Sequence, residues 1–186
     1  MVKQLYIALL LSFSSIYSQT PIPGLDSPND SSKISPEFEF VTLTGEKVSS
    51  GSLKGKIIVL DFWSSGCIPC RKAMPQMEKF YNQYKNDPRV VIYLVNSGWE
   101  TIEKVKSFAD SKRSTFLIFS YGSKYNLPFA YDNGSRTMKA FGFDSNPSTI
   151  IIDSKFRIRV KHSETIENIY DYLTGHVDLY LNEEHR

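Results

Sequence analysis

Two cysteines lie three positions apart, and they are the only cysteines among the 186 residues of the chain. Cys67 and Cys70 enclose Ile68 and Pro69. A C-x-x-C pair can bind a metal, form a fixed disulfide or exchange electrons with other thiols. One pair is too few for a disulfide framework or for a zinc site made of four cysteines. The chemistry of the thiols is therefore confined to one place.

The surroundings of the pair predict different roles for the two sulfurs. An apolar run over 56–63 is typical of a buried strand, and apolar residues recur at helical spacing from Met74 onward. A helix begins with unpaired N–H groups and the positive end of its dipole, which together stabilise a thiolate. We therefore expect Cys67 to be the nucleophile and Cys70, one turn further on, to be the more buried resolving thiol. Pro69 suits an early helical position that needs no N–H donor.

Asp61 is the only charged residue of the predicted strand interior, six residues before Cys67. A carboxylate among apolar neighbours is costly to bury, so we expect desolvation to raise its pKa. Perturbed carboxylates beside a nucleophile suit acid–base work. The alternative is an aspartate at a strand end that is hydrogen-bonded to nearby amides.

The rest of the chain predicts an α/β sheet of mixed direction, because strands alternate first with helices and then form a hairpin. Residues 115–125 fit a strand or a buried helix equally well. The other expected elements are a hairpin over 38–48, strands over 56–63, 90–96, 148–153 and 156–161, and helices from Cys67 to before Pro88 and over 101–112, 136–141 and 164–173.

Over 36–173 the chain resembles the thioredoxin superfamily, and most of all the exported TlpA/ResA-like thiol-disulfide oxidoreductases. The resemblance implies a thioredoxin-like fold, in which helices flank a central mixed sheet, with an N-terminal β-hairpin and a helix-strand insertion within 101–131. The motifs that carry it are the hairpin, Leu-Lys-Gly-Lys at 53–56, Asp-Phe-Trp at 61–63, Cys-Ile-Pro-Cys at 67–70, Pro75 and Asn-Pro-Ser at 146–148.

The same resemblance implies roles for the residues around the cysteines. Asp61 would accept the proton of Cys70 when a mixed disulfide is resolved. Pro147 would be a cis-proline packed against the C-x-x-C, and the backbone of Asn146 would pair with an extended substrate. For the tryptophan of the strand, a core position is the alternative to substrate contact. The substrate-binding residues that we expect are Trp63, Ile68, Pro69, Asn146 and Pro147.

Two other functions compete with redox exchange. A metallochaperone of the same fold would bind copper through Cys67, Cys70 and His162. A binding domain would keep the cysteines as a fixed disulfide. The histidines His162, His176 and His185 lack paired spacing, and we expect each of them at the surface. We therefore prefer an oxidoreductase that reduces protein disulfides, without a metal or a cofactor.

The first eighteen residues have the pattern of a secretory signal peptide. Lys3 precedes an apolar run over 5–11, and small Ser18 stands before Gln19. We expect cleavage after Ser18 and export to the periplasm, with a buried N-terminal helix or an uncleaved anchor as the alternative. The expected division is a signal peptide over 1–18, a proline-containing linker over 19–36, a thioredoxin-like domain over 37–175 and a C-terminal tail over 176–186.

The composition is that of one globular domain, with 41% hydrophobic and 23% charged residues. The 22 basic and 20 acidic residues leave a net charge of +2, and no basic stripe is interleaved with aromatic residues. Nucleic acid is therefore not an expected partner. We expect a monomer that acts on disulfide-bearing proteins, and the resemblance implies a membrane-bound electron donor.

Overall fold

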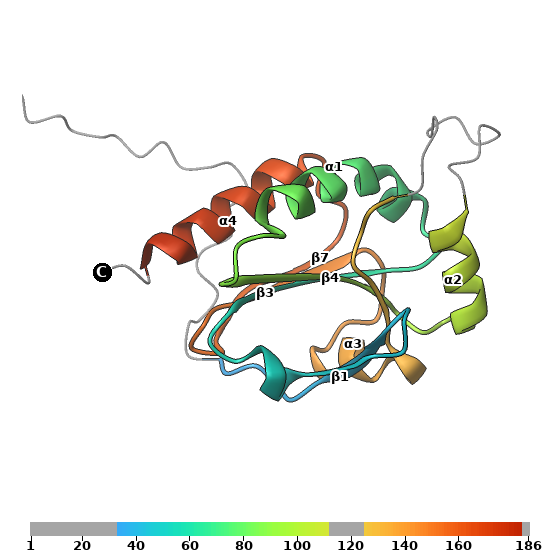
Figure 1. The fold of residues 1–186 in the computed structure, drawn as a ribbon, viewed down its shortest axis with the longest axis horizontal. Helices are drawn as coiled ribbons and strands as arrows, with labels where there is room; N and C mark the ends of the chain where they lie inside the picture. Colours follow the sequence, from blue (N-terminus) through green and yellow to red (C-terminus); the bar gives the residue numbers. More distant parts are fainter. Residues whose placement is uncertain (1–32, 112–124, 184–186) are drawn as a thin grey trace, which may run out of the picture.

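The centre of the fold is strand β3 (Ile57–Trp63), in which every residue is buried. A computed structural model describes residues 33–111 and 125–183 of the protein (Figure 1). Successive side chains of a strand point to opposite faces, so a strand covered on both sides is an unbroken apolar run. Ile57, Val59 and Trp63 join one core cluster, and Ile58, Leu60 and Phe62 join another on the opposite face.

The described residues form one mixed sheet with the strand order β2-β1-β5-β4-β3-β6-β7. Strand β4 is parallel to both β3 and β5, whereas the other neighbours pair antiparallel. The carboxyl ends of β3 and β4 therefore lie at the same edge. The remaining strands are β1 (Glu39–Thr42), β2 (Lys47–Ser49), β4 (Val90–Asn96), β5 (Phe129–Tyr131), β6 (Ser148–Ile152) and β7 (Ile158–Ser163).

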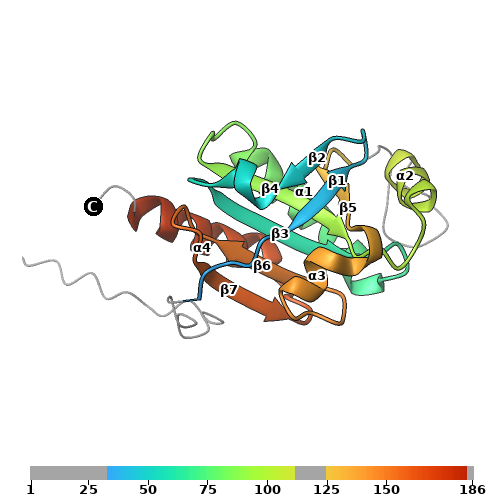
Figure 2. The same ribbon diagram turned by 90° about the horizontal axis from the view of Figure 1, so that it is seen from below.

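Helices cover both faces of the sheet. Helices α1 (Ile68–Tyr84) and α4 (Ile169–Glu183) lie together on one face, and α3 (Arg136–Ala140) lies on the other (Figures 1 and 2). Helix α2 (Ile102–Asp110) packs beside β5. Two short 3-10 helices are η1 (Ser50–Leu53) and η2 (Asn133–Ser135). Within the described ranges, no helix has the length and apolar character needed to cross a membrane.

Helix α1 forms because its apolar residues repeat at helical spacing. Its side chains Met74, Met77, Phe80 and Tyr84 are buried against the sheet and α4. The spacing gives the helix one continuous apolar face, so packing stabilises it. The two methionines are thus core residues.

The thioredoxin-like architecture predicted from the sequence is confirmed. Strand β4 has the predicted bounds, and α2 with β5 forms the expected helix-strand insertion. Residues 1–32 and 112–124 lie outside the described ranges. The signal peptide, most of the linker and nearly all of the ambiguous segment over 115–125 therefore remain predictions.

The predicted tail over 176–186 is wrong for 176–183, because α4 continues to Glu183. Val177, Tyr180 and Leu181 are buried, and so is His176, which was expected at the surface. A glycine inside a helix costs about 1 kcal/mol relative to alanine. The burial of several apolar side chains beyond Gly175 outweighs that cost.

The predicted linker is also too long at its C-terminal end. The backbone N–H of Ile158 donates to Lys33 at 2.8 Å, and that of Ser35 donates to Phe156 at 2.9 Å. Ile34 forms a bridge with Arg157. Residues 33–35 therefore pair with residues 156–158 at the beginning of the edge strand β7, whose outer backbone groups need partners.

Candidate active site around Cys67 and Cys70

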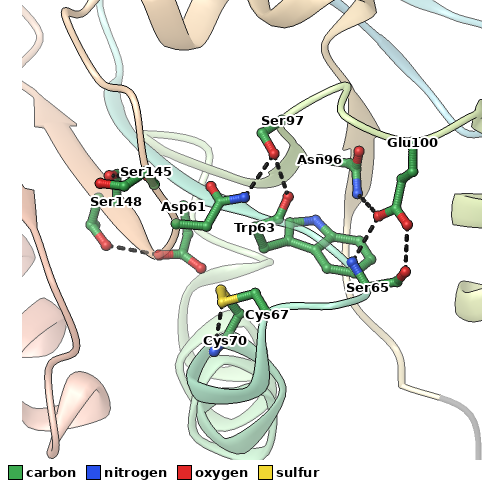
Figure 3. The surroundings of a disulfide bond; sticks show 12 residues. Asp61, Trp63, Ser65, Cys67, Cys70, Asn96, Ser97, Glu100, Ser145 and Ser148 are labelled. Carbon is green, nitrogen blue, oxygen red and sulfur yellow. Dashed lines mark hydrogen bonds between the residues drawn. A yellow bond between two sulfur atoms is a disulfide. The ribbon is translucent and has the colours of Figure 1, made fainter.

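Cys67 and Cys70 form a disulfide where β3 leads into α1, with their Cα atoms 5.3 Å apart (Figure 3). Cys67 is half-buried and is the N-cap residue of α1. Cys70 lies in the first turn and is only 3% exposed. The strand-to-helix position and the unequal burial predicted from the sequence are confirmed.

The first turn of α1 directs a backbone N–H group toward the sulfur of Cys67. The backbone N–H of Cys70 donates to Cys67 Sγ at 3.2 Å. Pro69 occupies one of the first positions of the helix, where an N–H would have no helical partner. After reduction, the N–H group and the helix dipole would stabilise a thiolate on Cys67.

Asp61 lies on the face of β3 that packs against α1, because it alternates with Val59 and Trp63 of the same core cluster. Its residue is 4% exposed, and Thr149 Oγ1 donates to its carboxylate at 2.7 Å. Burial raises the pKa of Asp61 to about 7, although the hydrogen bond from Thr149 acts in the opposite direction. The predicted rise of the pKa is confirmed, and Figure 3 shows the carboxyl group next to the turn that carries the disulfide.

Pro147 lies at the same edge of the sheet as the disulfide. The next residue, Ser148, begins β6 and pairs with Phe62 near the end of β3. The Asn146–Pro147 peptide bond is cis, as the resemblance implied. The side chain of Asn146 donates to Ser97 Oγ at 2.7 Å, so it fastens this loop to the end of β4.

Trp63 does not line the surface, and its predicted contact with substrate is wrong. It is fully buried, and its indole N–H donates to the Leu94 carbonyl at 3.1 Å. Its ring packs against Phe108 and Phe129 with centroids 5.0 Å apart in each pair. By contrast Ile68 is 63% exposed, as a residue in contact with substrate must be.

Glu100 belongs to the site, although it was not predicted from the sequence. Its carboxylate accepts hydrogen bonds from the backbone N–H of Ser65 at 2.7 Å, from the Ser65 hydroxyl and from Asn96 Nδ2 at 2.7 Å (Figure 3). Burial alone would raise the pKa of Glu100, but these hydrogen bonds outweigh it and hold the pKa below its usual value. Glu100 thus ties the loop before Cys67 to the end of β4.

The parallel pairing of β3 and β4 could have indicated this connection. Ends of neighbouring parallel strands meet at one edge, where ligand and catalytic sites of open sheets form. Polar residues stand at the last position of β4, Asn96, and directly after it, Ser97. From the sequence, only the end of β3, the cysteines and the loop at Asn146 and Pro147 were assigned to the site, and residues 97–100 were not.

His162 is not brought together with the cysteines as a set of metal ligands. It lies on β7, where it pairs with Thr149 and has its ring 6.0 Å from that of Tyr172. In the part of the chain that the structure describes, no three His, Cys, Asp or Glu side chains are grouped as a metal site. The geometry therefore gives the copper hypothesis no support.

Comparison with known proteins identifies thioredoxin-like proteins and thiol-disulfide oxidoreductases as relatives of the chain. The model of the AhpC/TSA family matches residues 32–161. The thioredoxin-like protein YneN of Bacillus subtilis is 34% identical over 70% of both chains. The thiol-disulfide oxidoreductase ResA of Bacillus cereus is 30% identical over 90% of this chain and 92% of its own.

A solved structure shares both the fold and a quarter of the sequence. The solution structure of a putative protein disulfide isomerase from Bacteroides thetaiotaomicron matches with a TM-score of 0.66 and 25% identity. The match covers 82% of this chain and 91% of that one. The disulfide at the junction of β3 and α1 agrees with these relatives. The chain belongs to the AhpC/TSA family and is a thioredoxin-like thiol-disulfide oxidoreductase.

Proposed function

We propose that the protein reduces disulfides of other proteins, with Cys67 as the nucleophile and Cys70 as the resolving thiol. The observation that carries the proposal is the asymmetry of the pair. Cys67 is half-buried and accepts an N–H hydrogen bond at the start of α1, whereas Cys70 is buried on the side of Asp61. An incoming disulfide reaches only the first of these sulfurs.

The reaction consists of two thiol-disulfide exchanges. The Cys67 thiolate attacks one substrate sulfur, forms a mixed disulfide and displaces the other substrate sulfur as a thiolate. Asp61 then takes the proton of Cys70, and the resulting thiolate attacks the sulfur of Cys67. The second substrate thiolate leaves, so two electrons have passed to the substrate and the Cys67–Cys70 disulfide remains.

The protein is exported and works as a monomer in this proposal. The leader-like first eighteen residues support export. A reductant outside the cytoplasm needs a supply of electrons, and a membrane-bound donor would re-reduce the disulfide. The C-x-x-C end of the sheet would bind that donor and the substrate in turn.

The reduction potential tests the direction of the reaction. The disulfide would be equilibrated with glutathione or dithiothreitol buffers, and the reduced fraction measured by thiol alkylation. A reductant is expected below about −200 mV, in the range of glutaredoxins and thioredoxin. A potential near −120 mV, about that of a strong oxidant, would contradict the proposed direction. A disulfide that resists dithiothreitol in the folded protein would contradict exchange altogether.

A further inference from the structure

Two exposed apolar side chains, Ile68 and Trp99, lie on the segments around the redox site. Among the described residues, four large apolar side chains are exposed, namely Ile34, Ile68, Trp99 and Leu179. Ile68 lies between the cysteines, and Trp99 precedes Glu100, which binds the loop before them. The other two lie on the N-terminal segment and on α4. Tryptophan is the residue type that most often dominates the energy of a protein interface.

Trp99 is 55% exposed although the residues on both sides of it are fixed. Gly98 has a φ of +71°, and a Cβ added there would overlap the backbone oxygen of Asp132. Its N–H donates to Asn96 Oδ1 at 3.1 Å. On the other side, the carboxylate of Glu100 is bound as described above, and the Tyr131 hydroxyl donates to its carbonyl at 2.9 Å. The exposure of Trp99 is therefore a property of an anchored turn.

This turn lies against the loop that carries Cys67. The backbone N–H of Ser97 donates to the Trp63 carbonyl at 2.9 Å, and Glu100 accepts from the N–H of Ser65 at 2.7 Å. Ser65 is only two residues before Cys67. The loop before Cys67 and the turn that carries Trp99 are therefore hydrogen-bonded neighbours.

Thiol-disulfide exchange at Cys67 brings a substrate polypeptide onto the surface around Ile68 and Trp99. A substrate whose sulfur contacts Cys67 lies beside the next residue, Ile68, which is 63% exposed. The segment of the substrate beside its cysteine then continues over the protein near the 97–100 turn or in the opposite direction along the Pro147 loop. The first direction leads to Trp99, the one exposed aromatic side chain among the described residues.

We propose that Trp99 is a substrate-binding residue, which Gly98 and Glu100 hold beside the disulfide so that it binds, together with Ile68, a large apolar side chain near the substrate cysteine. The proposal rests on the proposed function and names its substrate class. The substrates are extended polypeptides whose disulfide is flanked by aromatic or large aliphatic residues.

The test compares two disulfide-linked peptides that differ only in the residues beside the cysteine, leucine and phenylalanine in one and serine in the other. The measured quantity is the ratio of their kcat/KM values. Trp99→Ala should lower the ratio about tenfold, mainly through KM for the apolar peptide, and Trp99→Phe should keep most of it. Leu179→Ala removes an exposed side chain of α4 and should leave the ratio unchanged.

The outcomes separate the two proposals. An unchanged ratio in Trp99→Ala, with both peptides still reduced, would overturn the role of Trp99 and leave the oxidoreductase function standing. Failure of the unmodified protein to reduce either peptide would contradict the proposed function instead.

Tryptophan fluorescence gives a second measurement that does not depend on turnover. The chain has two tryptophans, and Trp63 is fully buried, so acrylamide quenches Trp99 selectively. A mixed disulfide of the apolar peptide with the Cys70→Ser protein should reduce quenching, whereas one with the serine peptide should not. Equal quenching in both complexes would overturn the proposal. So would protection by phosphatidylglycerol vesicles or by self-association in place of the peptide.

Discussion

Cys67 and Cys70 have the same chemistry but different surroundings, and the difference comes from one turn of helix. The N-cap position exposes the first sulfur and gives it an N–H partner, whereas the second points into the core on the side of Asp61. Burial raises the pKa of Asp61 to about 7, which suits a group that takes a proton at neutral pH.

Asp61 therefore predicts a pH-dependent resolution of the mixed disulfide. The carboxylate accepts a proton only above its pKa, so the rate should rise with pH through about 7. Asp61→Asn should lack that rise and be about 100-fold slower at pH 8. Stopped-flow release of the substrate thiol measures the rate. Thr149→Val removes the hydrogen bond that lowers the pKa and should move the rise to higher pH. A profile identical to that of the unmodified protein in Asp61→Asn would refute the role.

The same carboxyl group makes folding stability depend on pH. Below about pH 4 it is protonated in both states, since its unfolded pKa is about 3.9. Between about pH 4 and 7 only the unfolded chain releases the proton, so stability falls as the pH rises and stays lower above pH 7. A shift of about three pKa units corresponds to at most about 4 kcal/mol.

Urea unfolding of the oxidised Asp61→Asn protein measures this effect. The variant should gain stability relative to the unmodified protein on going from pH 4 to pH 8. An equal difference at the two pH values would show that burial of Asp61 carries no such cost.

At the scale of elements, Glu100 joins the β3–α1 loop to the β4–α2 turn. In Glu100→Ala, the N–H of Ser65 and the amide of Asn96 lose their acceptor, which should cost about 1–3 kcal/mol of unfolding free energy. The pKa of Glu100 is lowered, so its contribution is present above about pH 4.3 and is lost as the pH falls.

Urea unfolding at pH 7 and pH 3 tests the Glu100 connection. The difference between Glu100→Ala and the unmodified protein should shrink at the lower pH. Glu103→Ala changes an exposed glutamate of α2 and should shift stability by less than about 0.5 kcal/mol. A similarly small change of unfolding free energy in both variants would mean that the Glu100 carboxylate does not stabilise the connection between the two loops.

Helix α4 offers a matched pair of leucines to test where the domain ends. Leu181 is 8% exposed and Leu179 is 41% exposed. Leu181→Ala should cost about 2–5 kcal/mol because it opens a cavity in the core, whereas Leu179→Ala should cost little. Chemical denaturation of the two variants measures the difference. If both substitutions lowered the free energy of unfolding only slightly and equally, residues beyond 175 would not be part of the core, as the sequence predicted.

Over the whole molecule, the sequence predicted the strands and helices that are determined by hydrophobic periodicity and by local start and stop residues. The apolar run of β3, the helical spacing after Cys67 and the bounds of β4 are local patterns, and the cysteine roles followed from them. Contacts between distant segments left no such pattern. The Glu100–Ser65 hydrogen bonds span 35 residues, and the pairing of 33–35 with the beginning of β7 spans more than a hundred.

Trp63 and α4 show a second limit of the sequence. An aromatic residue beside a reactive cysteine fits a substrate contact as well as a core position, and only the packing of Phe108 and Phe129 decides between them. Likewise Gly175 resembles a helix end unless the burial of the residues beyond it is known.

Trapping of mixed disulfides shows which of the two cysteines is the nucleophile and which is the resolving thiol. Cys70→Ser and Cys67→Ser proteins would be mixed with an oxidised peptide, and the covalent complexes measured by mass spectrometry under non-reducing conditions. Cys70→Ser should accumulate the mixed disulfide through Cys67, because nothing resolves it, and Cys67→Ser should accumulate almost none. Equal trapping by the two variants, or trapping by Cys67→Ser alone, would contradict these roles of the two cysteines.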